Sequence, residues 1–161
     1  MPKGDLAVAK ELLRTHGVDC GPEGLAQVLE SLPRTSLRRR ELLCTEGDPS
    51  GSMWVLLSGS VQVIKRDYSG RAQKLAVLRA PAVVGHMGVV GGNPRSASCE
   101  AKTRIEVAVV DKERFQALLT ELSPAADAFR RLLISGMSRQ LATGNAALRR
   151  LLREAGPYRP S

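Results

Sequence analysis

The stretch from Val83 to Cys99 combines glycines and an arginine in a way that suits phosphate binding. Glycine lets the backbone approach a ligand closely and adopt positive φ angles. A helix that opens after Gly85 directs free N–H groups at an anion, and Arg95 adds a planar fork of donors that matches phosphate oxygens. We therefore expect a loop, a helical turn and an arginine that together hold a phosphate.

The same stretch resembles the phosphate-binding cassette of the cyclic nucleotide-binding domain family. That cassette usually reads F-G-E-(hydrophobic)-A-L and, a few residues later, P-R-(small)-A. Its arginine and nearby backbone amides hold the cyclic phosphate. The resemblance implies a ligand site made of Gly85, His86, Met87, Gly88, Arg95, Ser96 and Ala97, and cyclic AMP or cyclic GMP as the ligand. No other cofactor and no metal are expected.

Three positions depart from the family pattern: Val84 replaces the aromatic residue, Gly88 the alanine and His86 the glutamate. The family's glutamate takes the ribose 2′-hydroxyl. A histidine is bulkier, can be cationic, and favours an acceptor-rich ligand or an extra phosphate. The alternative is that His86 has turned outward because the site binds nothing. Ser96 either donates to the phosphate or to a guanine base, or is a turn residue.

Composition restricts the remaining possibilities. The chain has 161 residues and a net charge of +8, enough for one domain with a full core. No apolar run is long enough to span a bilayer, and the charged N-terminus is unlike a signal peptide. The cysteines are scattered without a CxxC pair, which indicates reduced thiols packed as small apolar side chains in a cytoplasmic protein. No catalytic constellation is present, so we do not expect an enzyme.

The elements that position the cassette follow from the hydrophobic pattern. Helical spacing over 5–14 and from Pro22 to Leu32 predicts two N-terminal helices. Short strands with turn residues between them predict an eight-stranded β-roll. The expected fold is therefore α+β and mainly β, a double-stranded β-helix or jelly roll. We expect a helical segment over 1–36, the cyclic nucleotide-binding-like roll over 37–120, a long helix over 121–155 and a tail over 156–161.

The long C-terminal helix carries an apolar stripe with heptad spacing. Its members are Ile134, Met137, Leu141, Leu148 and Leu151, with Gly144 at one position of the seam. The chain is also similar to the catabolite activator protein family, in which this helix is the dimer interface. The resemblance implies a homodimer through this seam. The alternative is that the stripe packs on the chain's own roll.

The same resemblance implies contacts to the adenine base from this helix. The family uses a threonine and a serine, whose aligned positions here are Gly144 and Asn145, with Thr143 one residue early. A shift of one residue turns a helical side chain by about 100°. Thr143 and Asn145 are therefore the possible base contacts, and Asn145 has the better register.

We interpret the sequence as a stand-alone regulatory domain that senses a cyclic nucleotide and acts on a separate protein partner. The alternative is a degenerate domain that binds no nucleotide and serves as a protein-interaction or scaffold module. Residues 112–161 hold nine Lys and Arg against four Asp and Glu, so a nucleic-acid-binding role ranks third. No groove-reading motif supports that role, and no membrane partner is expected.

Overall fold

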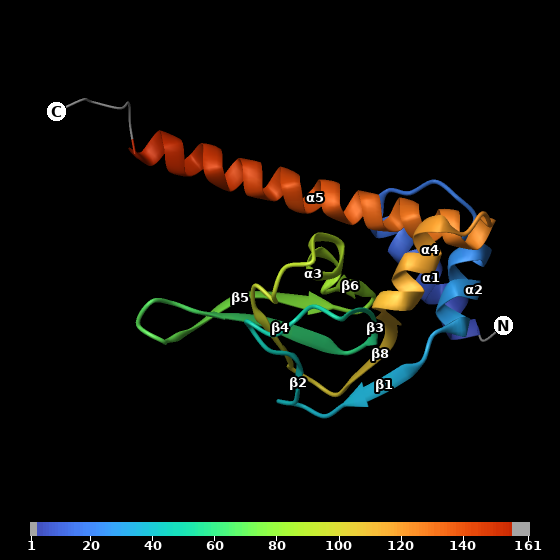
Figure 1. Ribbon diagram of the computed structural model, residues 1–161, viewed down its shortest axis with the longest axis horizontal. Helices are drawn as coiled ribbons and strands as arrows, with labels where there is room; N and C mark the ends of the chain where they lie inside the picture. Colours follow the sequence, from blue (N-terminus) through green and yellow to red (C-terminus); the bar gives the residue numbers. More distant parts are fainter. Residues whose placement is uncertain (1–2, 156–161) are drawn as a thin grey trace.

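The computed structural model describes residues 3–155, apart from the side chains of residues 3, 139–145, 147, 148, 151, 152 and 155. Two helices come first, then strands that enclose one short helix, then two more helices (Figure 1). In chain order these are α1 (Lys3–His16), α2 (Pro22–Ser31), β1 (Arg34–Leu37), β2 (Leu42–Cys44), β3 (Ser52–Ser58), β4 (Ser60–Arg66), β5 (Ala72–Arg79), β6 (Ala82–Val84), α3 (His86–Gly91), β7 (Ser98–Ala101), β8 (Ile105–Asp111), α4 (Lys112–Thr120) and α5 (Pro124–Ala155). The predicted α+β class is confirmed.

The strands form two antiparallel sheets of four, with the orders β1-β8-β3-β6 and β2-β7-β4-β5. β3 and β8 lie in the middle of the first sheet and consist mostly of buried and half-buried residues, as strands that are covered on both faces do. The inward side chains of both sheets meet inside the roll. They are Leu56, Val61, Val84, Cys99, Ala101, Ile105 and Val107.

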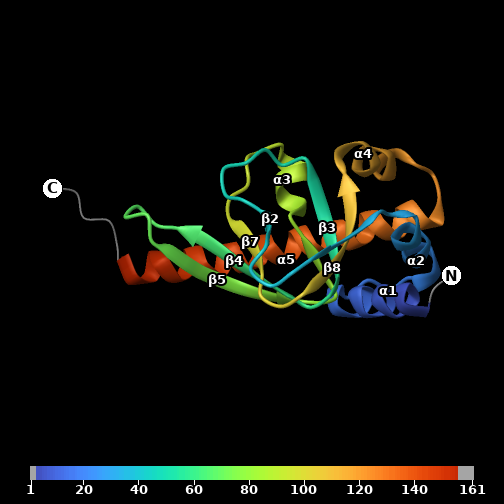
Figure 2. The same cartoon turned by 90° about the horizontal axis from the view of Figure 1, so that it is seen from below.

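The β4–β5 hairpin extends beyond the roll, on the same side as the far end of α5 (Figures 1 and 2). Most of β5 is exposed because none of the described strands pairs with its outer edge. The hairpin turn is held by Asp67, whose carboxylate accepts hydrogen bonds from the backbone N–H groups of Ser69 and Arg71. The cavity described below lies toward the other end of this sheet.

A second core joins the helices to the roll. α2 and the start of α5 approach closely, because Gly24 lies against the backbone of Pro124 and Ala125. Leu12, Leu25 and Phe129 are among the largest fully buried side chains. This helical base fixes the root of α5, which then runs past α3 and beyond the roll (Figure 1).

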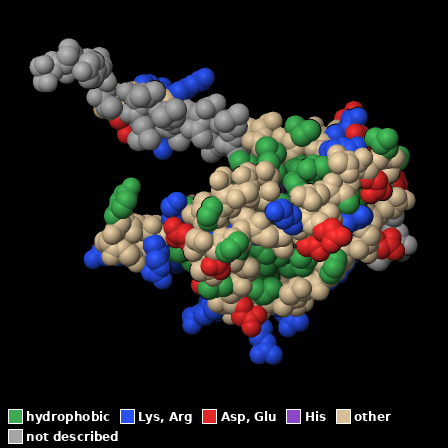
Figure 3. Space-filling model, in the orientation of Figure 1, with side chains coloured by type: hydrophobic (Ala, Val, Ile, Leu, Met, Phe, Trp, Pro, Cys, Tyr) green, Lys and Arg blue, Asp and Glu red, His purple; other side chains and the backbone are tan. Residues whose placement is uncertain are grey.

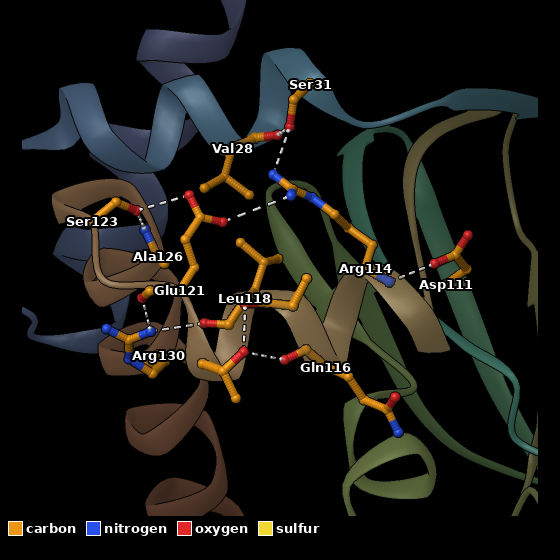
Figure 4. A network of polar contacts seen from close by, with 12 residues as sticks. Val28, Ser31, Asp111, Arg114, Gln116, Leu118, Glu121, Ser123, Ala126 and Arg130 are labelled. Atoms are coloured by element: carbon orange, nitrogen blue, oxygen red, sulfur yellow. Dashed lines mark hydrogen bonds and ion pairs between the residues drawn. The ribbon is translucent and has the colours of Figure 1, made fainter.

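Polar contacts hold α4 between α2 and α5 (Figure 4). Asp111 caps α4 by accepting from the Arg114 N–H at 2.7 Å, and Ser123 Oγ accepts from the Ala126 N–H at 3.1 Å at the start of α5. Arg130 donates to the carbonyls of Leu118 and Glu121, each at 2.8 Å. These bonds satisfy helix-end groups that have no partner within their own helices.

Two boundaries differ from the sequence-based expectation. α1 begins at Lys3, two residues before the predicted start, so Asp5 lies inside the helix, and its buried carboxylate pairs with Arg34. β1 begins at Arg34, within the segment expected to be helical (1–36). The Asp5–Arg34 ion pair joins the helical base to the first strand, and the start of β1 is set by its pairing with β8, in which Arg34 lies opposite Ala108; local patterns predict neither contact.

Basic side chains are dispersed over the face seen in Figure 3, from the β4–β5 hairpin to the underside of the roll. Acidic side chains lie among them. A nucleic-acid footprint is expected to be a continuous basic stripe or patch, and this face does not present one.

Candidate ligand-binding site

The cassette is a continuous segment from β6 through α3 to β7. Gly85 turns the chain between β6 and α3 with φ of +77°, a conformation that L side chains rarely adopt. A Cβ atom at this position would lie 2.7 Å from Arg95 Nη1 and 2.9 Å from Trp54 Cζ3. Glycine is therefore required for both the turn and the position of Arg95.

Arg95 is buried, with 7% of its surface exposed. Its guanidinium donates to the Gly85 carbonyl at 2.9 Å and to the Ser52 carbonyl, and it lies 4.7 Å from the centroid of the Trp54 ring. The ring contributes a cation–π contact. The role of Trp54 was not expected from sequence, where a lone tryptophan indicates only core or interface packing.

The backbone of Arg95 is held by the turn after β2. The Arg95 N–H donates to the Asp48 carbonyl, and the Gly47 N–H donates to the Arg95 carbonyl, each at 2.8 Å. Ser50 Oγ donates to the Asn93 carbonyl at 2.7 Å. The cassette loop is therefore fixed from outside, independently of any ligand.

The charge of Arg95 is not neutralised by a carboxylate. Among the residues that the structure describes, no Asp or Glu oxygen lies within 4.0 Å of its guanidinium. Its two hydrogen bonds to carbonyls leave further N–H groups of the fork for other acceptors. A buried cation without an anion is costly, so this arrangement favours an anionic ligand.

A cavity of about 350 Å³ opens beside Arg95. All seven residues predicted for the ligand site line it: Gly85, His86, Met87, Gly88, Arg95, Ser96 and Ala97. Met87 and Ser96 are exposed, whereas His86 and Arg95 are buried. The structure therefore brings the predicted residues together, and whether they bind a ligand stays a prediction.

Sequence reasoning missed the wall of the cavity that faces the cassette. It is formed by Cys44 of β2, Val63 of β4, Leu78 of β5 and Cys99 of β7, with Val83 of β6 nearby. The alternation of apolar residues along the strands indicated a buried face but not which residues meet. The cysteines carried no signal, because they are far apart in the chain.

His86 does not face solvent; 5% of its surface is exposed. Neither ring nitrogen has a hydrogen-bond partner among the described residues. Burial, and then the nearby His16, lower the pKa of His86 below its ordinary value, because both disfavour the charged form. The imidazole is therefore neutral at physiological pH, and the expected alternative of an outward-turned ring is wrong.

Gly88 also has a structural explanation. A Cβ atom there would collide with the side chain of Ser50 and lie 3.4 Å from Arg95 Nη1. Ser50 cannot move freely, since it bonds the Asn93 carbonyl. The glycine that stands where the family has alanine thus accommodates Ser50.

Several of the predictions on α5 fall outside the described residues. The side chains of Thr143, Asn145, Leu141, Leu148 and Leu151 lie outside the described residues. Ile134 is 64% exposed. Met137 is half-buried against the chain's own helical core. The dimer seam and the base contacts stay predictions. Part of the Met137 side chain packs within the protomer.

No group of three or more His, Cys, Asp or Glu suited to a metal occurs in the described part of the chain. Within residues 3–155 no helix is long and apolar enough to cross a membrane.

The profile of the cyclic nucleotide-binding domain family matches residues 34–121, more than half of the chain. The chain belongs to this family.

Among its relatives is a CRP-like cAMP-activated global transcriptional regulator of Mycobacterium tuberculosis, 21% identical over 131 residues. This match covers 80% of the chain and 58% of the regulator, so the chain spans little more than half of that relative.

Two solved structures share the fold. A cyclic nucleotide-binding domain from Methylobacillus flagellatus KT superimposes with a TM-score of 0.75 at 27% identity, over 91% of this chain and 84% of that one. The c-di-GMP-responsive global regulator CLP of Xanthomonas campestris gives 0.68 at 26% identity, over 80% and 63%.

Proposed function

We propose that this chain is a regulatory domain that binds a cyclic nucleotide at Arg95 and transmits occupancy through α5 to a protein partner. The observation that carries the proposal is the buried guanidinium of Arg95, which faces a cavity and has no carboxylate within 4.0 Å among the described residues. Membership of the family and a cAMP-activated relative support it. The proposal contains no catalytic step.

Cavity size favours a cyclic mononucleotide over a dinucleotide. Pockets for small molecules measure roughly 300–1,000 Å³, and this cavity, at about 350 Å³, lies at the lower end. The Xanthomonas regulator named for its response to c-di-GMP makes the dinucleotide the necessary comparison. Cyclic AMP and cyclic GMP are the two candidates, with the cyclic phosphate on Arg95.

Contact between α3 and α5 supports the transmission step. His86 is the first residue of α3 and lies against Gly136 of α5. Ser135 of α5 donates to the His16 carbonyl at 2.6 Å. A ligand that shifts α3 therefore acts directly on the part of α5 that is anchored to α1.

Calorimetric titration with cyclic AMP, cyclic GMP and c-di-GMP tests the proposal. We expect binding of a mononucleotide by the wild type, and loss of binding in Arg95→Ala, with exposed Arg39→Ala as the matched control. No heat and no thermal shift with any of the three at millimolar concentration would refute the sensor. The scaffold role would then be the remaining function.

A further inference from the structure

Two cysteines that are 55 positions apart in the chain lie opposite each other in the wall of the ligand cavity. Cys44 and Cys99 are direct partners in the antiparallel β2–β7 pair, and both line the cavity. Such partners have Cα atoms about 4.5–5.5 Å apart. A disulfide spans about 4.4–6.8 Å between Cα atoms, a range that includes the spacing of such strand partners.

A β-bulge creates this pairing. Leu42 pairs with Glu100, and the register then shifts so that Cys44, not Leu43, lies opposite Cys99. In an unbroken register, Leu43 would lie opposite Cys99. Bulges re-aim a side chain at defined positions, and here the result is two thiols on one cavity wall.

The thiols differ in reactivity. A hydrogen bond from Cys99 and the positive charge of Arg95 lower the pKa of Cys44 to about 7, against the opposing effects of burial and of Asp48. The same contact with Cys44, together with burial, raises the pKa of Cys99. The lowered pKa gives Cys44 a larger thiolate fraction near neutral pH than an ordinary cysteine has, and the thiolate is the nucleophilic form. Cys99 remains a protonated neighbour.

We propose that Cys44 and Cys99 are a peroxide-sensitive dithiol that closes to an intramolecular disulfide and thereby adjusts anion binding at Arg95. The Cys44 thiolate attacks a peroxide oxygen, the O–O bond breaks, and a sulfenic acid and hydroxide (or alkoxide) form. The Cys99 thiol then condenses with the sulfenic acid, forming the S–S bond and releasing water. The two thiols together lose two electrons, which the peroxide accepts.

The direction of the effect follows from charge. A thiolate beside Arg95 offsets part of the positive potential that an anionic ligand needs. The disulfide is neutral, so oxidation removes that negative charge and tightens ligand binding, by roughly two- to tenfold near pH 7.5. This regulatory part rests on the proposed function; formation of the disulfide does not.

Disulfide formation is tested first, without ligand. The full chain is treated with hydrogen peroxide and its peptides are mapped by mass spectrometry without reductant. We expect a Cys44–Cys99 peptide in the wild type and in Cys20→Ser, which lacks the cysteine outside the cavity. A map that shows only sulfinic acid or intermolecular bridges through Cys20 would overturn the proposal. Alkylation of the Cys44 peptide in Cys20→Ser, followed by mass spectrometry across pH 6–9 with Cys99 intact, should report a midpoint near the lowered pKa of Cys44; a midpoint at the ordinary thiol value would also contradict the proposal.

Regulation is tested by calorimetry with cyclic AMP and cyclic GMP. One of the two nucleotides is expected to bind. Oxidised wild type should bind that nucleotide more tightly than reduced wild type does. Cys44→Ser, or Cys44→Ala if serine lowers stability, should bind like the oxidised form and ignore peroxide. Equal or weaker binding after oxidation would refute the regulatory part. No binding in either state would refute the proposed function, while the peptide map would still decide whether the dithiol exists.

Discussion

His86 of the cassette helix and His16 at the end of α1 flank the same residue of the long helix, Gly136. A methyl group at position 136 would lie 3.6 Å from His86 Nε2 and 3.7 Å from His16 Nε2. His16 Nδ1 is 3.0 Å from the Leu12 carbonyl, whereas neither nitrogen of His86 has a partner among the described residues. Cassette, N-terminal helix and α5 therefore meet at one point.

Stability should fall in mild acid because of His86. Its folded-state pKa lies below the unfolded value near 6.5. Well above pH 6.5 neither state binds the proton, so His86 does not lower the free energy of unfolding there. As the pH falls through 6.5 the unfolded chain binds a proton that the folded chain refuses, so the free energy of unfolding decreases until the folded pKa is reached.

Urea unfolding of wild type and His86→Gln from pH 5 to 8 measures this decrease. The glutamine variant should show a flatter profile below pH 6.5. His16→Gln removes the second cause but leaves burial, so most of the slope should persist. Parallel profiles for wild type and His86→Gln would show that another group is responsible.

Gly136 has room for one methyl group but no more. Its hypothetical Cβ makes only ordinary contacts, at 3.6–3.8 Å, and alanine is favoured over glycine within a helix by about 1 kcal/mol. Gly136→Ala should therefore raise stability by about 0.5–1 kcal/mol, and Gly136→Leu should lower the melting temperature by displacing the histidines. Thermal melts compare the two; a destabilised alanine variant would show that the packing there is tighter than described.

Gly85→Ala should lower the free energy of unfolding more than Gly47→Ala does, although both glycines have a left-handed backbone conformation. Gly47 has φ of +88° and open space around it, whereas Gly85 has φ of +77° and Arg95 beside it. Both variants should lose about 1–2 kcal/mol from the left-handed conformation, and Gly85→Ala should lose more through collision. Equal melting temperatures for the two would place Arg95 farther from position 85.

His86→Glu should tighten binding of a cyclic mononucleotide if the cassette works as in its family. A charge-assisted hydrogen bond contributes about 1.5–3 kcal/mol, which is roughly ten- to a hundredfold in affinity. His86→Gln supplies the isosteric control without charge. Calorimetry that shows unchanged or weaker binding for the glutamate variant would contradict this account of the ribose contact.

A homodimer through α5 should be sensitive to Ile134, an exposed large apolar side chain of the predicted seam. Ile134→Lys places a charge in that seam and should shift the protein to monomer in sedimentation. Leu122→Lys alters a more exposed residue between α4 and α5 and is the matched control. A monomeric wild type at micromolar concentration would assign the stripe to the protomer alone.

The fold was predictable from sequence where the pattern is local. The turn glycines, the short apolar strands and the helical periodicity of α5 each depend on neighbours a few residues away. The cassette was likewise recognisable, because its glycines and Arg95 lie within eleven positions of one another, from Gly85 to Arg95. These parts agree with the structure.

Contacts between distant segments could not be predicted in this way. Trp54 lies under Arg95, and Asp5 pairs with Arg34, because two sheets and a helical base bring those residues together. The burial and the lowered pKa of His86 likewise depend on its neighbours in α1 and α5.

By itself the sequence predicted the type of site: glycines for close approach and an arginine for an anion. Only the tertiary structure decided the state of that site. Among the residues that the structure describes, it placed no carboxylate within ion-pair distance of Arg95 and enclosed His86 without a hydrogen-bond partner. It also used one bulge to set Cys44 opposite Cys99. The physical reason is that charge balance, burial and strand register are properties of several segments packed together, and no single segment specifies them.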